Sequence, residues 1–306
     1  MAEAIEVAGL TKRFGGRRGS DGALAVDDLS FTVSPGRIVG FLGPNGAGKT
    51  TTLRALLGLL QPTAGTATIE GRAFDQLPSP GEAVGAVLDG GMFHPGRSGR
   101  NHLRTLARAA GVPESRADEM LELVQLTADG GRRAKGYSLG MRQRLGLAAA
   151  LLGNPRVLVL DEPANGLDPQ GIRWLRDLLR ALANQGRAVL VSSHVLAEVA
   201  QTADEVVVIH RGRSVLQAPL GELMARHAGG TRVAGPDTGR LAELLRADGA
   251  EVRAEPDGSI VVTGHTGERI GGLVAEHRVH IAELSPIAQS LEDVFFELTG
   301  GEGGPG

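Results

Sequence analysis

The sequence predicts an α/β domain built on a parallel sheet, followed by a small α+β domain. An apolar run at residues 38–42 stops at a glycine-rich turn, and leucines at helical spacing follow over 49–60. Two more apolar runs, at 157–160 and 188–191, are flanked by helical patterns, which is typical of strands buried on both faces. After residue 229 the pattern alternates in the order β-α-β-β-α-β, which indicates a second domain.

The length of 306 residues accommodates one large domain and one small one. We expect the first domain at residues 1–228, with a helical subdomain at about 90–152, where helical patterns crowd together and strand signals are rare. The second domain is expected at 229–300 with a ferredoxin-like arrangement, whose last strand lies at 278–284. The glycine-rich tail at 301–306 is expected to be disordered.

Composition excludes several classes of protein. The net charge of −3 provides no basic field for gripping nucleic acid, so nucleic acid is not an expected partner. The absence of cysteine excludes disulfides, thiolate zinc sites and iron–sulfur clusters. No apolar run approaches the ~20 residues that a membrane-crossing helix needs, and the first residues show no signal-peptide pattern. We therefore expect a soluble, cytoplasmic chain.

A glycine-rich segment between the first parallel strand and its helix fits the phosphate-loop pattern, and it reads Gly43-Pro44-Asn45-Gly46-Ala47-Gly48-Lys49-Thr50. Glycines let backbone N–H groups converge on a phosphate, and the following helix points its positive end at the same anion. Lys49 would add a charge for the β- and γ-phosphates, Thr50 a hydroxyl for Mg²⁺, and Thr51 a further phosphate contact. A chance glycine turn is the alternative, and the flanking strand and helix argue against it.

An acidic pair follows the apolar strand at 157–160, where the sequence continues Asp161-Glu162-Pro163. Asp161 is placed to hold the Mg²⁺ shell, and Glu162 to orient or deprotonate an attacking water. The alternative is a solvated strand end. The carboxyl ends of parallel strands are where α/β sheets bind ligands, which favours the chemical interpretation.

Three further segments complete a set of five: Tyr137-Ser138-Leu139-Gly140-Met141-Arg142-Gln143-Arg144 before an Ala/Leu-rich helix, then Asn165-Gly166-Leu167-Asp168-Pro169, and then Ser192-Ser193-His194. In their order along the chain, the five segments resemble the motifs of the ATP-binding-cassette (ABC) ATPase family. The resemblance covers about residues 4–225 and implies an ABC-type nucleotide-binding domain.

The resemblance also implies roles for these segments. Ser138 and Gly140 would face the γ-phosphate held by a second copy of the chain, so that two subunits sandwich two ATP molecules. Asp168 would belong to the nucleotide-binding residues. His194 would contact the γ-phosphate and the attacking water beside Glu162, whereas a structural histidine is the alternative.

Some positions match the family less directly. Phe14 resembles the aromatic residue that stacks on adenine, and a plain core or surface phenylalanine is the alternative. Asp89 stands where the family has a glutamine that joins the Mg²⁺ site to the membrane partner, and its carboxylate still offers Mg²⁺ an oxygen. An acidic residue there resembles the subgroup of bacitracin- and daunorubicin-resistance exporters. Leu139 and Met141 replace a common glycine and a common glutamine.

The function that the resemblance implies is ATP hydrolysis, with Lys49, Glu162 and His194 as catalytic residues and ATP and Mg²⁺ as cofactors. Closure of a homodimer would power a separate polytopic membrane subunit, docked near 89–110, that exports drugs, antibiotics or lipids. The chain would then be peripheral on the inner face of the cell membrane. We expect the second domain to support the dimer or to serve packing, and ligand sensing is its alternative role.

Two other functions compete with transport. One is a soluble ABC-type ATPase acting in translation or DNA repair, although such relatives usually carry two cassettes, coiled-coil insertions or zinc cysteines, none of which this sequence has. The other is a regulator that binds ATP without hydrolysing it, and the presence of both Glu162 and His194 argues against it.

Overall fold

The computed structural model describes residues 3–15, 22–88, 93–226, 230–287, 291 and 294–295. Its contacts divide the chain into two compact units, one that ends at Leu220 and one that begins at Gly221. This division places helix α8 (Leu220–Arg226) almost wholly in the second unit, whereas the sequence analysis expects it in the first domain. Among the described residues, none of the helices has the length and apolar character that crossing a membrane requires.

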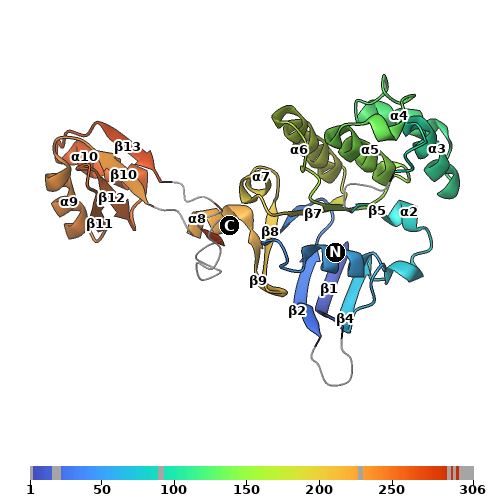
Figure 1. The fold of residues 1–306 in the computed structure, drawn as a ribbon. Coiled ribbons are helices and arrows are strands. Elements are labelled where there is room, and N and C mark those ends of the chain that lie inside the picture. Colours follow the sequence, from blue (N-terminus) through green and yellow to red (C-terminus); the bar gives the residue numbers. More distant parts are fainter. Residues whose placement is uncertain are drawn as a thin grey trace. The chain divides into compact units, whose positions relative to one another are not determined.

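A six-stranded sheet forms the centre of the first unit, with the order β5-β6-β7-β3-β8-β9 (Figure 1). All neighbours are parallel except β8 and β9, which pair antiparallel. Every residue of β3 and β6 is buried, as their apolar sequences predict. The strands are β3 (Ile38–Leu42), β5 (Val84–Val87), β6 (Val157–Asp161), β7 (Ala188–Ser193), β8 (Glu205–His210) and β9 (Arg213–Pro219).

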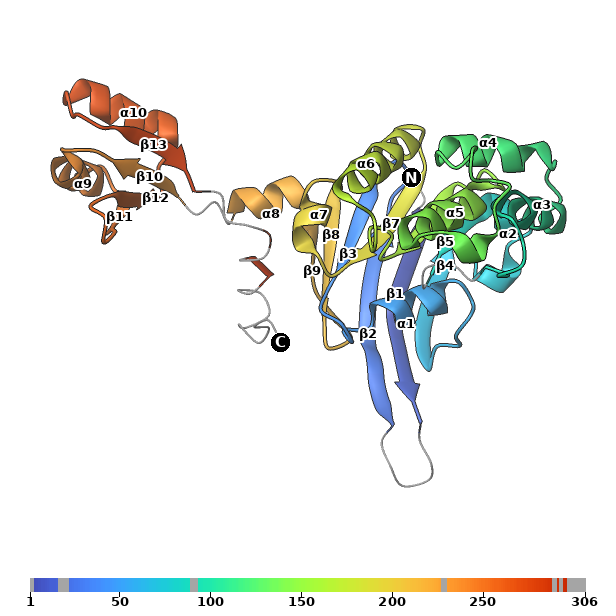
Figure 2. The ribbon, with the colours of Figure 1, turned by 45° about the horizontal axis from the view of Figure 1, so that its top comes forward.

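An antiparallel sheet, with the order β2-β1-β4, packs on one face of this central sheet through helix α1 (Figure 2). The two sheets share one apolar core, in which the rings of Phe31 and Phe41 lie 5.1 Å apart. Its elements are β1 (Ile5–Phe14), β2 (Ala23–Val33), α1 (Lys49–Leu56) and β4 (Ala64–Ile69).

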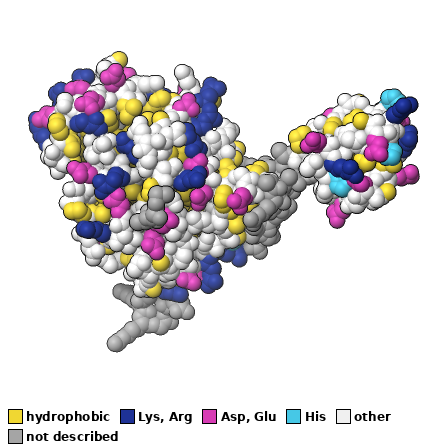
Figure 3. Space-filling model, turned by 180° about the vertical axis from the view of Figure 1, so that it is seen from behind, with side chains coloured by type: hydrophobic (Ala, Val, Ile, Leu, Met, Phe, Trp, Pro, Cys, Tyr) yellow, Lys and Arg dark blue, Asp and Glu magenta, His cyan; other side chains and the backbone are white. Residues whose placement is uncertain are grey.

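Helices cover the opposite face of the central sheet and enclose a second core (Figure 1). Alternate residues of β6 serve the two cores, since Val157 and Val159 face the first and Leu158 and Leu160 the second. The helices on this face include α3 (Gly99–Ala109), α4 (Ser115–Leu123), α5 (Leu139–Leu151) and α6 (Pro169–Asn184). The unit also contains the short helices α2 (Pro80–Ala83) and α7 (Leu196–Ala200) and 3₁₀ turns at Phe74–Gln76 and Ala134–Gly136, and Ala83 and Phe74 pack in the first core. Basic and acidic side chains are interspersed over the face seen in Figure 3.

The second unit contains an antiparallel sheet of order β11-β12-β10-β13, and apolar residues of two helices form its core with the sheet. Its elements are β10 (Thr231–Ala234), α9 (Thr238–Ala247), β11 (Glu251–Ala254), β12 (Ile260–Thr263), α10 (Gly267–Glu276) and β13 (Glu283–Pro286). The last strand lies later than the expected 278–284. Arg278 adopts a left-handed backbone with φ of 48°, and the His280 N–H donates to Asp237 instead of to a strand. The predicted tail at 301–306 lies outside the described residues.

Hydrogen bonds of His265 and Arg269 to Asp248, here called the histidine clamp, link α9 and α10. His265 Nδ1 lies 2.8 Å from the Gly264 carbonyl oxygen, and Nε2 lies 2.8 Å from Asp248 Oδ2. Both partners accept hydrogen bonds, so the geometry suits the doubly protonated imidazolium. The Gly264 carbonyl and the Asp248 carboxylate raise the pKa of His265. Arg269 also donates to both oxygens of Asp248, which links the end of α9 to the start of α10.

Loss of the His265 proton should loosen this clamp. A raised pKa in the folded state means that the stabilisation is fully present below the ordinary imidazole pKa of about 6.5 and is lost as the pH rises through the raised value. We expect amide hydrogen exchange in α9 and α10 of the full chain, corrected for intrinsic rates, to accelerate over that range. His265→Gln should remove this pH dependence and His277→Gln should keep it. An unchanged pH dependence in His265→Gln would contradict the assignment.

Candidate functional site

The phosphate loop lies between β3 and α1, where the chain passes close to two other backbone segments. At Gly48, φ is +107°, and a Cβ atom would lie 2.5 Å from the Ala25 carbonyl oxygen. This position therefore requires glycine. The Ala47 N–H donates to the Pro44 carbonyl across the turn at 3.1 Å, and the exposed residues Pro44, Asn45 and Gly46 form its tip. No side chain caps α1 at its start. The first N–H groups of a helix have no partner within the helix, so the start of α1 suits an anion site.

Lys49 is a buried cation, with only 6% of its side chain exposed. Its Nζ donates to the carbonyl oxygens of Gly43, at 2.7 Å, and Pro44, at 3.3 Å. The same atom lies 3.5 Å from Glu162 Oε1. The ammonium group therefore joins the phosphate loop to the acidic end of β6.

Asp161, the last residue of β6, is 5% exposed and has both carboxylate oxygens occupied. Thr50 Oγ1 donates to Oδ2 at 2.7 Å, and Ser192 Oγ donates to Oδ1. A hydroxyl and a carboxylate beside a phosphate loop are oxygen donors of the kind Mg²⁺ takes, because this ion binds through one or two carboxylates plus phosphates and keeps several waters. Thr50 and Asp161 therefore fit a magnesium site.

Glu162 has a strained backbone, with φ of 49°, a left-handed value that is uncommon for a residue other than glycine. Its N–H donates to Ser192 Oγ at 3.0 Å and lies 3.2 Å from the Ser192 carbonyl oxygen. Its Oε2 lies 2.8 Å from His194 Nδ1, whose side chain is 41% exposed. The carboxylate thus lies between Lys49 and His194.

Three of the predicted residues, Ser138, Gly140 and Asp168, form a separate cluster. Ser138 Oγ accepts from the Met141 N–H at 3.2 Å and caps α5, while Asp168 Oδ1 accepts from the Gly171 N–H at 2.8 Å and caps α6. These two helix starts pack together, because a Cβ at Gly140 would lie 3.2 Å from the Gly166 carbonyl oxygen. Within the described part of the chain, no hydrogen bond or ion pair joins this cluster to the phosphate loop.

Phe14, Thr51 and Asp89 are the other predicted site residues. Phe14 ends β1 with 43% of its surface exposed, and Lys12 Nζ lies 5.2 Å from its ring centroid. Thr51 is the third residue of α1 counting Lys49 as the first, and it is half-buried. Asp89 lies outside the described residues.

Ser192 is a site residue to which the sequence analysis assigns no role. It is fully buried and stands opposite Asp161 in the parallel register of β6 and β7. Its hydroxyl connects the Asp161 carboxylate to the Glu162 N–H. Its place directly before Ser193 and His194 is visible in the sequence, but the pairing register that gives it two partners is not.

Comparison with known proteins decides the family. Residues 26–165 match the ABC transporter family, and residues 229–292 match a domain of unknown function (DUF8746). The chain is 36% identical to the Bacitracin transport ATP-binding protein BcrA of Bacillus licheniformis, over 98% of this chain and 99% of that protein. The chain belongs to the ABC transporter ATP-binding proteins. A bacitracin transport ATP-binding protein of Enterococcus faecalis is 34% identical to this ABC protein, over 99% of the chain and 98% of the relative.

The fold of this ABC protein is also that of solved relatives. A structure described as the ATP binding subunit of an ABC transporter superposes with a TM-score of 0.64 at 27% identity, covering 73% of this chain and 92% of that one. Members of the family bind and hydrolyse ATP, and this chain is an ABC ATPase. The resemblance predicted from the five motifs is confirmed.

Removing the Ser192 hydroxyl should weaken the site. In Ser192→Ala, the buried Asp161 carboxylate loses a donor, which costs about 1–3 kcal/mol in unfolding free energy, while the Glu162 N–H keeps the Ser192 carbonyl oxygen as an acceptor. We also expect kcat for ATP hydrolysis to fall about tenfold, or ~1.4 kcal/mol of activation free energy. Urea unfolding and steady-state ATPase assays measure the two effects. Ser193→Ala is the control, because among the described residues the Ser193 hydroxyl bonds only within its own turn, to Val195. Equal losses in both variants would contradict the role of Ser192.

Proposed function

We propose that this ABC ATPase drives an exporter of drugs or antibiotics, in which ATP-dependent closure of a homodimer moves a separate polytopic membrane subunit. The observation that carries the proposal is the likeness over nearly the whole chain to two proteins named for bacitracin transport. A third relative, 34% identical over 97% of this chain, is named as the Nod factor export ATP-binding protein I of Ralstonia nicotianae. The name of this third relative supports export over import.

The proposed chemistry starts from the contacts of Lys49. The γ-phosphate of ATP would compete with Glu162 for the ammonium group, which lies 3.5 Å from that carboxylate. Once released, Glu162 accepts a proton from the attacking water. His194, already 2.8 Å from Glu162, is placed to donate to the γ-phosphate and so register its presence. Lys49, Glu162 and His194 are therefore the proposed catalytic residues.

The remaining nucleotide contacts follow from the phosphate loop. The N–H groups of residues 43–48 and the start of α1 would hold the phosphates, with Thr51 as a further contact. Thr50 and Asp161 would hold Mg²⁺, with Asp89 as a proposed third oxygen donor. When bound, Mg²⁺ neutralises phosphate charge during transfer. The exposed ring of Phe14 is proposed to stack on adenine.

A second copy of the chain is proposed to complete the site. Ser138 and Gly140 lie at the start of α5, and Asp168 caps α6, in a cluster separate from the chain's own phosphate loop. A helix start attracts anions, so this cluster suits the γ-phosphate of a partner's ATP. Leu139, 54% exposed beside Gly140, supports the same surface, since a large exposed apolar side chain is one that a partner would cover.

The membrane subunit is proposed to dock along residues 89–110. Helix α3 forms the described end of this segment and exposes Leu106. Beneath it, the Phe93 ring packs edge-on against His102 at 5.1 Å, which anchors the preceding loop to the helix. Docking of the membrane subunit on this segment would hold the ATPase peripherally on the inner membrane face.

The role of Glu162 predicts a strong loss of turnover without a loss of binding. Because a general base contributes about 10²–10⁴-fold, Glu162→Gln should reduce kcat by at least about a hundredfold. A fluorescent ATP analogue should still bind, since the phosphate loop is unchanged. Asp177→Asn, on the exposed face of α6, is the control. Turnover of Glu162→Gln near that of the wild type would remove Glu162 from catalysis.

Co-purification tests the transport assignment. A tagged chain is recovered from detergent-solubilised membranes of its source cells, and the proteins that accompany it are identified by mass. We expect a polytopic membrane protein at near-equal stoichiometry and ATPase activity above that of the chain alone. Recovery only from the cytosol, with ribosomes, DNA or no partner, would overturn the transport assignment and leave the ATPase assignment standing.

A further inference from the structure

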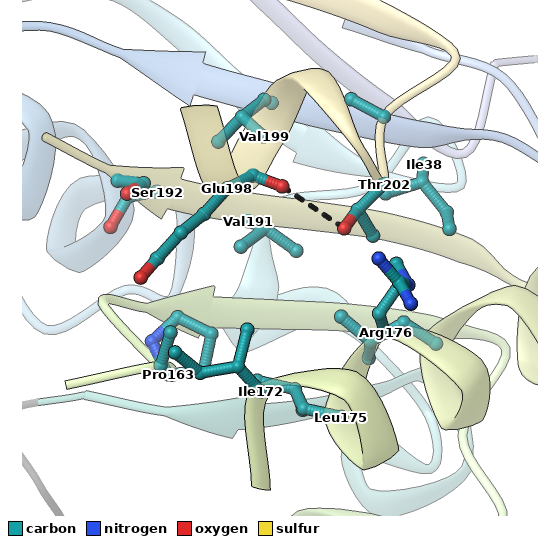
Figure 4. Close-up of a pocket in the computed structure, with 15 residues that line it drawn as sticks. Ile38, Pro163, Ile172, Leu175, Arg176, Val191, Ser192, Glu198, Val199 and Thr202 are labelled. Atoms are coloured by element: carbon teal, nitrogen blue, oxygen red, sulfur yellow. Dashed lines mark hydrogen bonds between the residues drawn. The ribbon is translucent and has the colours of Figure 1, made fainter. Parts of the chain in front are cut away.

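A narrow apolar cleft of about 50 Å³ lies between the central sheet and helices α6 and α7 (Figure 4). Its walls come from four elements, and one end is formed by Pro163, which directly follows Glu162. The apolar side chains around it include Ile38, Ile172, Leu175, Val191 and Val199. The cleft is therefore lined by Pro163 and Ser193, the direct chain neighbours of the two residues proposed to act on the γ-phosphate.

Glu198 places a carboxylate in this apolar cleft. Figure 4 shows its side chain reaching from α7 along the cleft to the side where Pro163 and Ser192 lie. Across the described residues, no hydrogen bond or ion pair of its carboxylate is found, and only its main-chain carbonyl accepts, from Thr202 Oγ1 at 3.1 Å. Arg176, which also lines the cleft, donates to Gln201 at 2.8 Å instead. Burying part of a carboxylate without a hydrogen-bond partner costs free energy, so the placement of Glu198 requires a physical explanation.

The electrostatic neighbours of Glu198 are the groups of the site. Burial raises its pKa, the negative charge of Glu162 raises it further, and His194 acts in the opposite direction. Glu198 therefore lies within electrostatic range of both Glu162 and His194.

Close packing fixes the position of helix α7, from which the Glu198 side chain extends. Val199, the next residue, is 4% exposed and packs on β3 at Gly40, where any Cβ would overlap the Val199 side chain. Because β3 and α7 approach so closely, α7 cannot rotate to carry Glu198 out of the cleft without losing this contact.

We propose that Glu198 is a positioning residue for ATP hydrolysis, whose negative charge behind the site holds the Glu162 carboxylate towards Lys49 and His194. Like charges disfavour any rotamer that turns Glu162 into the cleft. The remaining direction is the observed one, with Oε1 3.5 Å from Lys49 Nζ and Oε2 2.8 Å from His194 Nδ1. The inference rests on the proposed catalytic role of Glu162.

Variants that separate charge from shape test the proposal. Glu198→Gln keeps the shape and removes the charge, and we expect kcat to fall about tenfold while KM for ATP changes less than twofold. Glu198→Asp keeps the charge and should retain several-fold more activity than Glu198→Gln. Thr202→Val alters the same cleft without a change of charge and should leave kcat within twofold of the wild type. If Glu198→Gln does not fold, Glu198→Met suits the apolar cleft and should show the same loss.

Three outcomes decide the matter. Wild-type kcat in Glu198→Gln or Glu198→Met would overturn the proposal. So would equal losses in Glu198→Asp and Glu198→Gln, because charge would then not be the cause. Glu162→Gln, assayed in parallel, separates this failure from that of the proposed function: if it stays active, the role of Glu162 itself is wrong, whatever the Glu198 variants do.

Discussion

The parallel register of β6 and β7 is the constraint on which the site depends. It places Asp161 opposite Ser192, and the Ser192 hydroxyl then bonds both the Asp161 carboxylate and the Glu162 N–H. Glu162 and His194 each follow one of these strands, so the same register brings their side chains within 2.8 Å. A shift of either strand by one residue would turn the side chains of that strand to the other face of the sheet and break these contacts.

Charge is the second element that holds the site together. Lys49 is buried and shares its ammonium group between two loop carbonyls and Glu162, while the other oxygen of Glu162 meets His194. The carboxylate therefore already spans the space between the two groups proposed to meet the γ-phosphate. Glu198, on the far side, disfavours the alternative position of that carboxylate.

Sequence patterns predicted the strongly apolar elements well and the weak ones poorly. The apolar runs of β3, β6 and β7 and the leucine spacing of α1 carry their own signals, because burial on both faces demands them. Strands β4 and β9 were not predicted, since both contain mostly exposed or half-buried residues. Their strand geometry comes from pairing with β1 and β8. The sequence pattern also placed the last strand too early. Strand β13 begins at Glu283, after the N–H of His280 has bonded to the Asp237 side chain.

By itself, the sequence determined the phosphate loop, the acidic pair, the segment that ends in His194 and hence the family, because each is a local pattern of residue types around a strand end. Only the tertiary structure decided which of these groups touch. Thr50 and Asp161 are 111 residues apart and bond at 2.7 Å, and Ser192 and Glu198 take part through sheet register and helix packing. The physical reason is that hydrogen bonds and charge repulsion act over a few ångströms in space. Local patterning predicts the strands, but the neighbours of each strand follow from the burial of the whole sheet.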